Sequence, residues 1–147
     1  GLARIEQLHL LPALASRILL PQAVWNEVTA AKTEAPGALE ISQATWIEVQ
    51  QVTHPVESLR ILLDPGEAEA IALARTLPGC LVLIDDSRAR RVAEYLGVRR
   101  MGTVGLLRRA KQAGLIEQLR PQLEALKENG IHIRKELIDA VLREVGE

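Results

Sequence analysis

The stretch from Asp64 to Asp86 limits the possible folds more than any other part of the chain. It opens with Asp64-Pro65-Gly66-Glu67, which places Asp at the N-cap, Pro at N1 and Glu at N3 of a helix. It closes with Cys80–Ile84, a continuous apolar run typical of a strand covered by helices on both faces, followed by Asp85 and Asp86. Acids at these places lie where an open parallel sheet collects its ligands, and they suggest a hard divalent cation.

Short strands and helices alternate along the whole chain. Strands are predicted at Arg17–Leu20, Trp46–Val52, Cys80–Ile84 and Val98–Met101. Helices are predicted at Leu2–Leu14 with a break at Pro12, Gln22–Ala31, Ala38–Gln43, Val56–Leu62, Asp64–Leu77, Ser87–Leu96, Val104–Ala113, Pro121–Glu128 and Lys135–Val145. The segments Lys32–Gly37 and His54-Pro55 separate elements. This alternation predicts one domain over residues 1–147, an α/β three-layer sandwich with a short parallel sheet.

The composition excludes several classes of function. Apolar residues make up 48% of the chain but Phe is absent, which argues against a base-stacking platform for single strands. A single cysteine, Cys80, excludes an intrachain disulfide and favours a reducing cytoplasm. The apolar runs are short and interrupted by charge, so we expect a protein that does not enter a membrane.

The net charge of −1 conceals an asymmetry along the chain. Residues 1–86 hold 11 acids and 5 bases, whereas residues 87–147 hold 8 acids and 13 bases. Glu94 is the only acid between Arg88 and Lys111. An ordinary solvated surface would explain such a basic stretch, but its position directly after Asp85 and Asp86 also suits a polyanionic backbone.

Each candidate acid also has a purely structural interpretation. Glu67 could complete a capping box with Asp64, and Asp86 could cap the helix that begins at Ser87. Glu27 could be a solvated residue on a helix flank. Either Asp64 or Glu69 could take the place of Glu67 as a ligand.

The adjacent pair Asp85 and Asp86 presents a separate problem. Two neighbouring aspartates at the mouth of a strand repel each other, so they need a compensating cation or a basic neighbour. Arg88 or Arg90 could supply that charge in place of a metal.

Four segments together resemble the PIN-domain nucleases, in particular an uncharacterised prokaryotic PIN-like branch related to VapC-type toxins. These segments are Leu19–Val28, Gly66–Ala74, Leu83–Arg88 and Gly102–Leu107. Their order and spacing extend the resemblance over nearly the whole chain. The last of them contains a Gly102–Gly105 signature, which we interpret as a tight turn into a helix and not as a catalytic element.

The resemblance implies an endoribonuclease that depends on Mg²⁺ or Mn²⁺ and serves as the toxin of a toxin–antitoxin pair. Glu27, Glu67 and Asp86 match the family's metal-binding and catalytic acids, with Asp85 as an adjacent alternative. Arg88, Arg91 and Arg108 are the candidate RNA contacts. The implied partners are RNA, a cognate antitoxin protein and a second copy of the chain. A catalytically silent PIN-like module that binds protein or nucleic acid is the alternative.

One departure from the family concerns the start of the chain. The family begins with a central strand ending in Asp, whereas Leu2-Ala3-Arg4-Ile5 already resembles the helix that follows this strand. The chain begins with Gly1, and its only methionine is Met101, so we expect a fragment or a processed chain. On this comparison the chain would lack the first central strand and one metal ligand, and would be inactive unless they are supplied.

Overall fold

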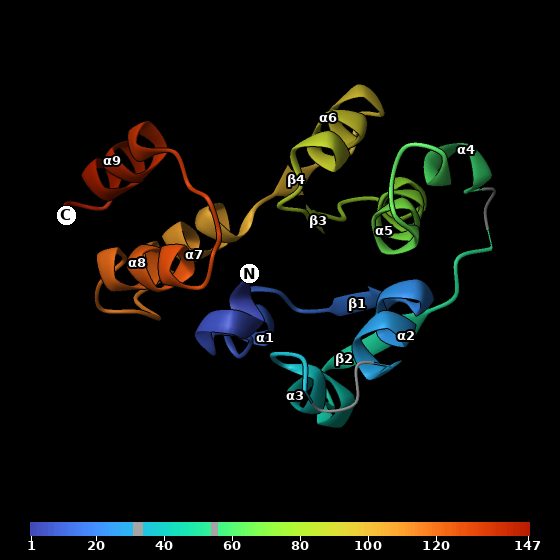
Figure 1. Cartoon of the computed structure of the whole chain (residues 1–147), viewed down its shortest axis with the longest axis horizontal. Coiled ribbons are helices and arrows are strands. Elements are labelled where there is room, and N and C mark those ends of the chain that lie inside the picture. Colours follow the sequence, from blue (N-terminus) through green and yellow to red (C-terminus); the bar gives the residue numbers. More distant parts are fainter. Residues whose placement is uncertain (31–33, 54–55) are drawn as a thin grey trace. The chain divides into compact units, whose positions relative to one another are not determined.

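The computed structural model of the chain forms two compact units, and it describes residues 1–30, 34–53 and 56–147 (Figure 1). The strand-containing unit is Arg17–Gly102. The helical unit consists of Gly1–Ser16 and Thr103–Glu147. The predicted break at His54-Pro55 and the start of the predicted loop Lys32–Gly37 lie outside the described residues.

The strand-containing unit alternates short strands with helices. Its elements are β1 (Ile18–Pro21), α2 (Gln22–Ala30), α3 (Ala38–Gln43), β2 (Ile47–Gln50), α4 (Glu57–Arg60), α5 (Pro65–Thr76), β3 (Val82–Leu83), α6 (Ser87–Tyr95) and β4 (Arg100–Met101). Strands β1 and β2 pair in parallel, with Ile18 opposite Ile47, and β3 pairs in parallel with β4, with Val82 opposite Arg100. Helices connect the two strands of each pair, as parallel pairing requires. The predicted α/β class with short parallel sheets is confirmed.

The apolar run Cys80–Ile84 differs from its prediction in length and in burial. Only Val82 and Leu83 form the strand. Val82 and Ile84 are buried, whereas Leu81 and Leu83 are 36% and 40% exposed. The expectation of cover on both faces is therefore wrong. Successive side chains of a strand point to opposite faces, and this one buries a single face despite its uniformly apolar sequence.

The core of the strand-containing unit lies where α5 meets α6 and β3. Ala68, Ile71 and Ala72 form the buried face of α5, and Ala89 and Ala93 form that of α6. The two alanines of α6 are four residues apart and therefore share one face of the helix. Because alanine side chains are short, the two helices can pack closely.

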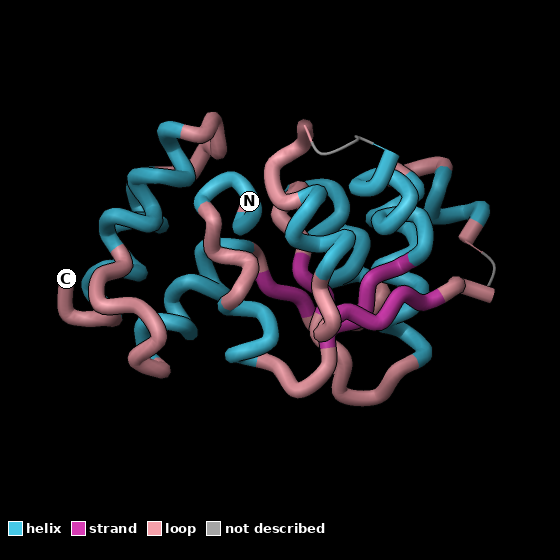
Figure 2. Tube along the Cα trace, turned by 90° about the horizontal axis from the view of Figure 1, so that it is seen from below, coloured by secondary structure: helices cyan, strands magenta, loops and turns pink. Residues whose placement is uncertain are grey.

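The helical unit contains helices and loops, drawn in cyan and pink in Figure 2. Its elements are the 3₁₀ helix η1 (Leu2–Ile5), α1 (Leu10–Leu14), α7 (Thr103–Gln112), α8 (Arg120–Glu128) and α9 (Lys135–Glu144). Fully buried leucines, including Leu107, Leu123 and Leu126, form its core. No helix in the described ranges is both long and apolar enough to span a bilayer.

The predicted helix Leu2–Leu14 is divided, but not at Pro12. The division falls at Glu6, which takes a left-handed conformation with φ 56° at the end of η1. Pro12 lies within the first turn of α1. Proline is tolerated there because the first backbone N–H groups of a helix have no partner within it.

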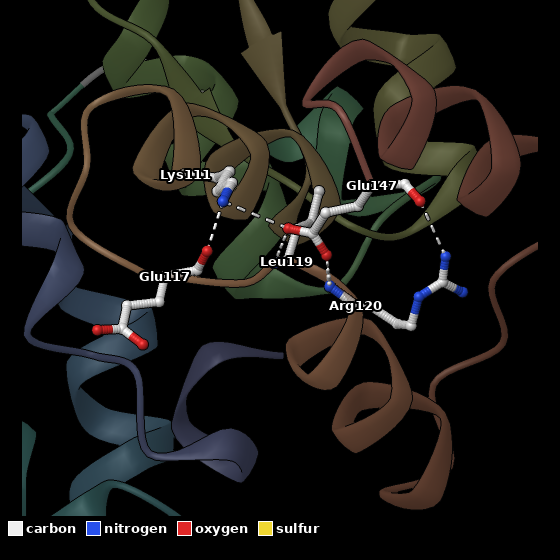
Figure 3. Close-up of polar contacts among 5 residues, drawn as sticks. All are labelled: Lys111, Glu117, Leu119, Arg120 and Glu147. Carbon is white, nitrogen blue, oxygen red and sulfur yellow. Dashed lines mark hydrogen bonds and ion pairs between the residues drawn. The ribbon is translucent and has the colours of Figure 1, made fainter.

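The side chain of Glu147 holds the start of α8 (Figure 3). Its carboxylate accepts hydrogen bonds from the backbone N–H groups of Leu119 at 2.6 Å and Arg120 at 3.0 Å. Lys111 of α7 lies 3.5 Å from the same carboxylate and also donates to the carbonyl oxygen of Glu117. The Leu119 hydrogen bond is the main cause of a lowered pKa for Glu147. One carboxylate thus connects three segments of the helical unit.

Candidate metal centre

Two aspartates cap the helices that carry the candidate site. Asp64 Oδ1 accepts a hydrogen bond from the backbone N–H of Glu67 at 2.8 Å, at the start of α5. Asp86 Oδ1 accepts one from the backbone N–H of Ala89 at 2.9 Å, at the start of α6. The predicted N-caps are confirmed. Both helices present the positive end of their dipole to nearby carboxylates.

Glu67 lies among other acids. Partial burial is the main cause of a raised pKa for its carboxyl group, and the negative charges of Asp64, Asp86 and Glu27 raise that pKa further. A hydrogen bond from the backbone of Asp64 acts in the opposite direction. The charges of Asp86, at the N-cap of α6, and of Glu27, on α2, are therefore felt at Glu67 in the first turn of α5.

Glu27 lies beside the start of α5 because α2 packs closely on the first turn of that helix. Gly66 is buried there, and a Cβ atom built on it would lie 3.0 Å from Val24 Cγ2 and 3.5 Å from Glu27 Oε2. Any larger residue at position 66 would occupy this narrow space. The Glu27 side chain is exposed, but its oxygen lies directly over the start of α5.

Asp85 has different neighbours from Asp86. A Cβ atom built on the buried Gly102 would lie 3.1 Å from Asp85 Oδ1 and 3.4 Å from one terminal nitrogen of Arg90. Asp85 therefore lies beside Gly102 and Arg90, at the end of β4. Of the two basic neighbours considered for the aspartate pair, Arg90 is the one placed near Asp85.

Glu69 is buried and accepts hydrogen bonds from two other elements. Its Oε2 accepts from the backbone N–H of Ala23 at 2.8 Å, and its Oε1 accepts from Arg60 at 3.1 Å. Glu69, the alternative to Glu67 as a ligand, therefore has both carboxylate oxygens engaged within the protein. Its position on the buried face of α5, three residues before Ala72, is the sequence signal that distinguishes it from the more exposed Glu67.

The three candidate arginines have different environments. Arg88 and Arg91 are exposed on α6, and Arg91 Nε donates to the carbonyl oxygen of Ser87 at 3.3 Å. Arg108 belongs to the helical unit and forms an ion pair with Glu144 at 2.7 Å. The charge of Arg108 is thus already offset within its own unit.

The donor set suits a hard cation that keeps part of its water shell. Among the described residues, no three or more His, Cys, Asp or Glu side chains lie close enough together to enclose a metal ion. Mg²⁺ does not require such a cage, because proteins usually hold it through one or two carboxylates together with water and substrate phosphates. The neighbouring acids that help to raise the pKa of Glu67 also favour added positive charge. One or two of the carboxylates of Glu27, Glu67 and Asp86, together with water, therefore fit Mg²⁺ or Mn²⁺ in chemistry and in charge.

Parallel strands, helical crossovers and acids at helix starts define an α/β protein whose site suits a divalent cation. A family model described as a PIN domain matches residues 1–147, so the chain belongs to the PIN-domain family. The PIN domain is a nuclease-type fold, and its members generally depend on divalent metal. No curated protein and no solved structure matches the chain.

Proposed function

We propose that this protein is an endoribonuclease that uses Mg²⁺ or Mn²⁺. The observation that carries the proposal is the environment of Glu67 in a chain of the PIN-domain family: burial and the charges of Asp64, Asp86 and Glu27 raise its pKa, and Glu27 Oε2 lies beside Gly66. Glu27, Glu67 and Asp86 come from α2, α5 and the start of α6. Such a concentration of negative charge is unfavourable unless a cation offsets it.

Each residue has a defined part in this proposal. Glu27, Glu67 and Asp86 would hold the cation, which when bound lowers the pKa of a water molecule and offsets charge that develops on the phosphate. Asp86 can cap α6 with Oδ1 and still offer its second oxygen. Asp85, beside Arg90, is the adjacent acid and is assigned a secondary place.

The RNA contact is proposed on α6. Arg88 and Arg91 lie on the helix that Asp86 caps, so cationic side chains and a candidate metal ligand share one short element. Phosphate groups on either side of the cleaved bond would find positive charge there. The ion pair with Glu144 makes Arg108 the weakest of the three candidates.

The biological setting is proposed from the resemblance to VapC-type toxins. In this setting the protein is the toxin of a toxin–antitoxin pair, with a cognate antitoxin protein and a second copy of the chain as partners. The single cysteine supports a reducing cytoplasm as its location.

Cleavage of labelled RNA tests the proposed activity. We expect a version of the protein that also carries the family's first strand and its Asp to cut single-stranded RNA in Mn²⁺ or Mg²⁺ and to stop in EDTA; this version is the parent of the variants tested below. Glu67→Gln should cut far more slowly, whereas Glu136→Gln, at an exposed acid of the helical unit, should match the parent. Equal cutting by the parent and by Glu67→Gln would overturn the proposal.

A second candidate function is a silent module that binds nucleic acid or protein. The observation that favours it is that the described part of the chain contains no enclosed group of three metal-ligating side chains. Binding of RNA that persists unchanged in EDTA, without cleavage of any RNA tested, would support the module over the enzyme.

A further inference from the structure

We infer that Glu69 is a positioning residue that holds α2 against α5 and thereby keeps Glu27 at the metal centre. This inference rests on the proposed function for its metal, but the contact that carries it is present in the chain alone. Glu69 is 9% exposed, and two elements distant in sequence donate to its two oxygens.

The contact with Ala23 fixes the start of α2. The first N–H groups of any helix have no partner within that helix, and Ala23 is the second residue of α2. Its N–H donates to Glu69 Oε2 at 2.8 Å, across 46 residues of sequence. A carboxylate at this end of α2 is also favoured by the helix dipole.

Arg60 binds the second carboxylate oxygen of Glu69. Its terminal nitrogen lies 3.1 Å from Glu69 Oε1, and its side chain is 46% exposed whereas that of Glu69 is 11% exposed. The ion pair therefore orients a buried acid from the surface. With both oxygens occupied in this way, Glu69 serves as a connector between α4, α5 and α2.

The hydrogen bond at Ala23 also affects the position of Glu27 on the same helix. Ala23 and Glu27 are four residues apart and lie on the same side of α2. The same side meets α5 at Gly66, close to Val24 and Glu27. Loss of the Glu69 hydrogen bond would let the start of α2 move away from α5 and carry the Glu27 carboxylate with it.

Hydrogen exchange in metal-free protein tests the contact itself. Glu69→Gln preserves side-chain size, but it replaces one acceptor oxygen with an NH2 donor and removes the negative charge, so any hydrogen bond that Ala23 still donates loses its charge assistance. For this reason we expect amide exchange at Ala23 to accelerate about tenfold or more. Glu48→Gln is the matched control, because it removes an ion pair with Arg17 in the same unit, and it should leave exchange at Ala23 unchanged. Unchanged exchange at Ala23 in Glu69→Gln would overturn the inference.

Binding of Mn²⁺ alone, followed by electron paramagnetic resonance, tests whether Glu69 acts through Glu27. Glu69→Gln should weaken Mn²⁺ binding by about tenfold, the lower end of the effect of altering a support behind a metal ligand. In a Glu27→Gln background the same substitution should have little further effect. A loss of equal size in both backgrounds would show a merely structural role and would overturn the inference.

A milder variant, Arg60→Gln, and the behaviour of the parent protein complete the test. Arg60→Gln leaves the Ala23 hydrogen bond in place, so it should weaken Mn²⁺ binding less than Glu69→Gln does; this milder variant serves if Glu69→Gln fails to fold. If Arg60→Gln accelerates Ala23 exchange by less than twofold and leaves Mn²⁺ binding at the parent value, Arg60 has no part in the contact that Glu69 makes between α4, α5 and α2. If the parent binds no Mn²⁺ and cuts no RNA, the proposed function fails, while exchange at Ala23 still decides the contact between α2 and α5.

Discussion

Asp86 has two roles, and its two carboxylate oxygens allow both. Oδ1 accepts the hydrogen bond that caps α6, while the charge of the carboxylate acts on Glu67. Asparagine caps a helix about as well as aspartate does, but it carries no charge. The two roles can therefore be separated by substitution.

We predict that Asp86→Asn changes the free energy of unfolding by less than about 0.5 kcal/mol. Its RNA cleavage rate should fall about 100-fold, as is typical when one electrostatic group is removed from an active site. Asp86→Ala should lose the activity and also about 1 kcal/mol of stability. Urea unfolding and a cleavage assay measure the two effects. Full activity in Asp86→Asn would leave Asp86 as a cap only.

Glu67 is placed where its charge opposes folding. Burial and neighbouring acids raise the pKa of Glu67 in the native state above its ordinary value of 4.5. In the pH window between the unfolded-state pKa and the native-state pKa, the native state therefore binds more protons than the unfolded chain. Stability should therefore fall as the pH rises through that window. The usual carboxylate, with a lowered pKa, behaves in the opposite way.

Because the charged form of Glu67 is disfavoured in the native state, we predict that Glu67→Gln is more stable than the parent at pH 7 but inactive. Glutamine removes the charge and still suits the N3 position of a capping box. The gain in the free energy of unfolding should shrink as the pH is lowered from about pH 7 to about pH 4, because protonated Glu67 is also neutral. Urea titrations across this range measure it. A variant less stable than the parent at pH 7 would contradict the prediction.

At the scale of the elements, the packing of α2 on α5 depends on Gly66. We predict that Gly66→Ala lowers the free energy of unfolding by about 1 kcal/mol, because the new Cβ atom would lie 3.0 Å from Val24 Cγ2. Val24→Ala removes the obstructing methyl group, so adding Gly66→Ala to that variant should cost nothing further. An equal loss in both backgrounds would place the cause elsewhere. Urea unfolding of the parent, Gly66→Ala, Val24→Ala and the double variant measures these differences in stability.

The elements whose signals are local could be predicted from sequence. Asp64 and Asp86 cap α5 and α6 as expected, because a cap is formed within four residues of chain. Gly97 and Gly114, which follow α6 and α7, have the left-handed φ values of 70° and 73° that favour glycine.

Features that depend on distant contacts could not be predicted in the same way. The length of β3 depends on its pairing with β4, and a uniformly apolar run does not reveal that only one face is covered. The hydrogen bond from Ala23 to Glu69 crosses 46 residues, so no local pattern reveals it. The family resemblance selected Glu27 and Glu67, but the position of Glu27 beside Gly66 is a tertiary result.

At the scale of the whole molecule, the charge asymmetry gives a prediction about salt. Each arginine that neutralises a phosphate of a single strand contributes about 0.7 to the slope of log affinity against log salt concentration. We predict that Arg88→Gln and Arg91→Gln each reduce the slope for RNA binding by about this amount. Fluorescence anisotropy over a salt series measures it.

Arg108→Gln is the comparison variant for this experiment. Arg108 is already paired with Glu144, so its loss should change the slope little. A change as large as that of Arg88→Gln would assign an RNA contact to the helical unit as well. No change at Arg88 or at Arg91 would remove α6 from the RNA-binding surface.

The close approach at Gly66 also has a consequence for how sequences of this kind diverge. Val24 and Gly66 share one small space, and Ala23 and Glu69 share one hydrogen bond. Among related chains, a residue larger than glycine at position 66 should therefore occur together with one smaller than valine at position 24. By contrast, the hydrogen bond of the second pair requires of position 23 only a backbone N–H, which every residue except proline supplies. Substitutions should thus be correlated at positions 24 and 66, whereas the contact with Glu69 should exclude proline at position 23.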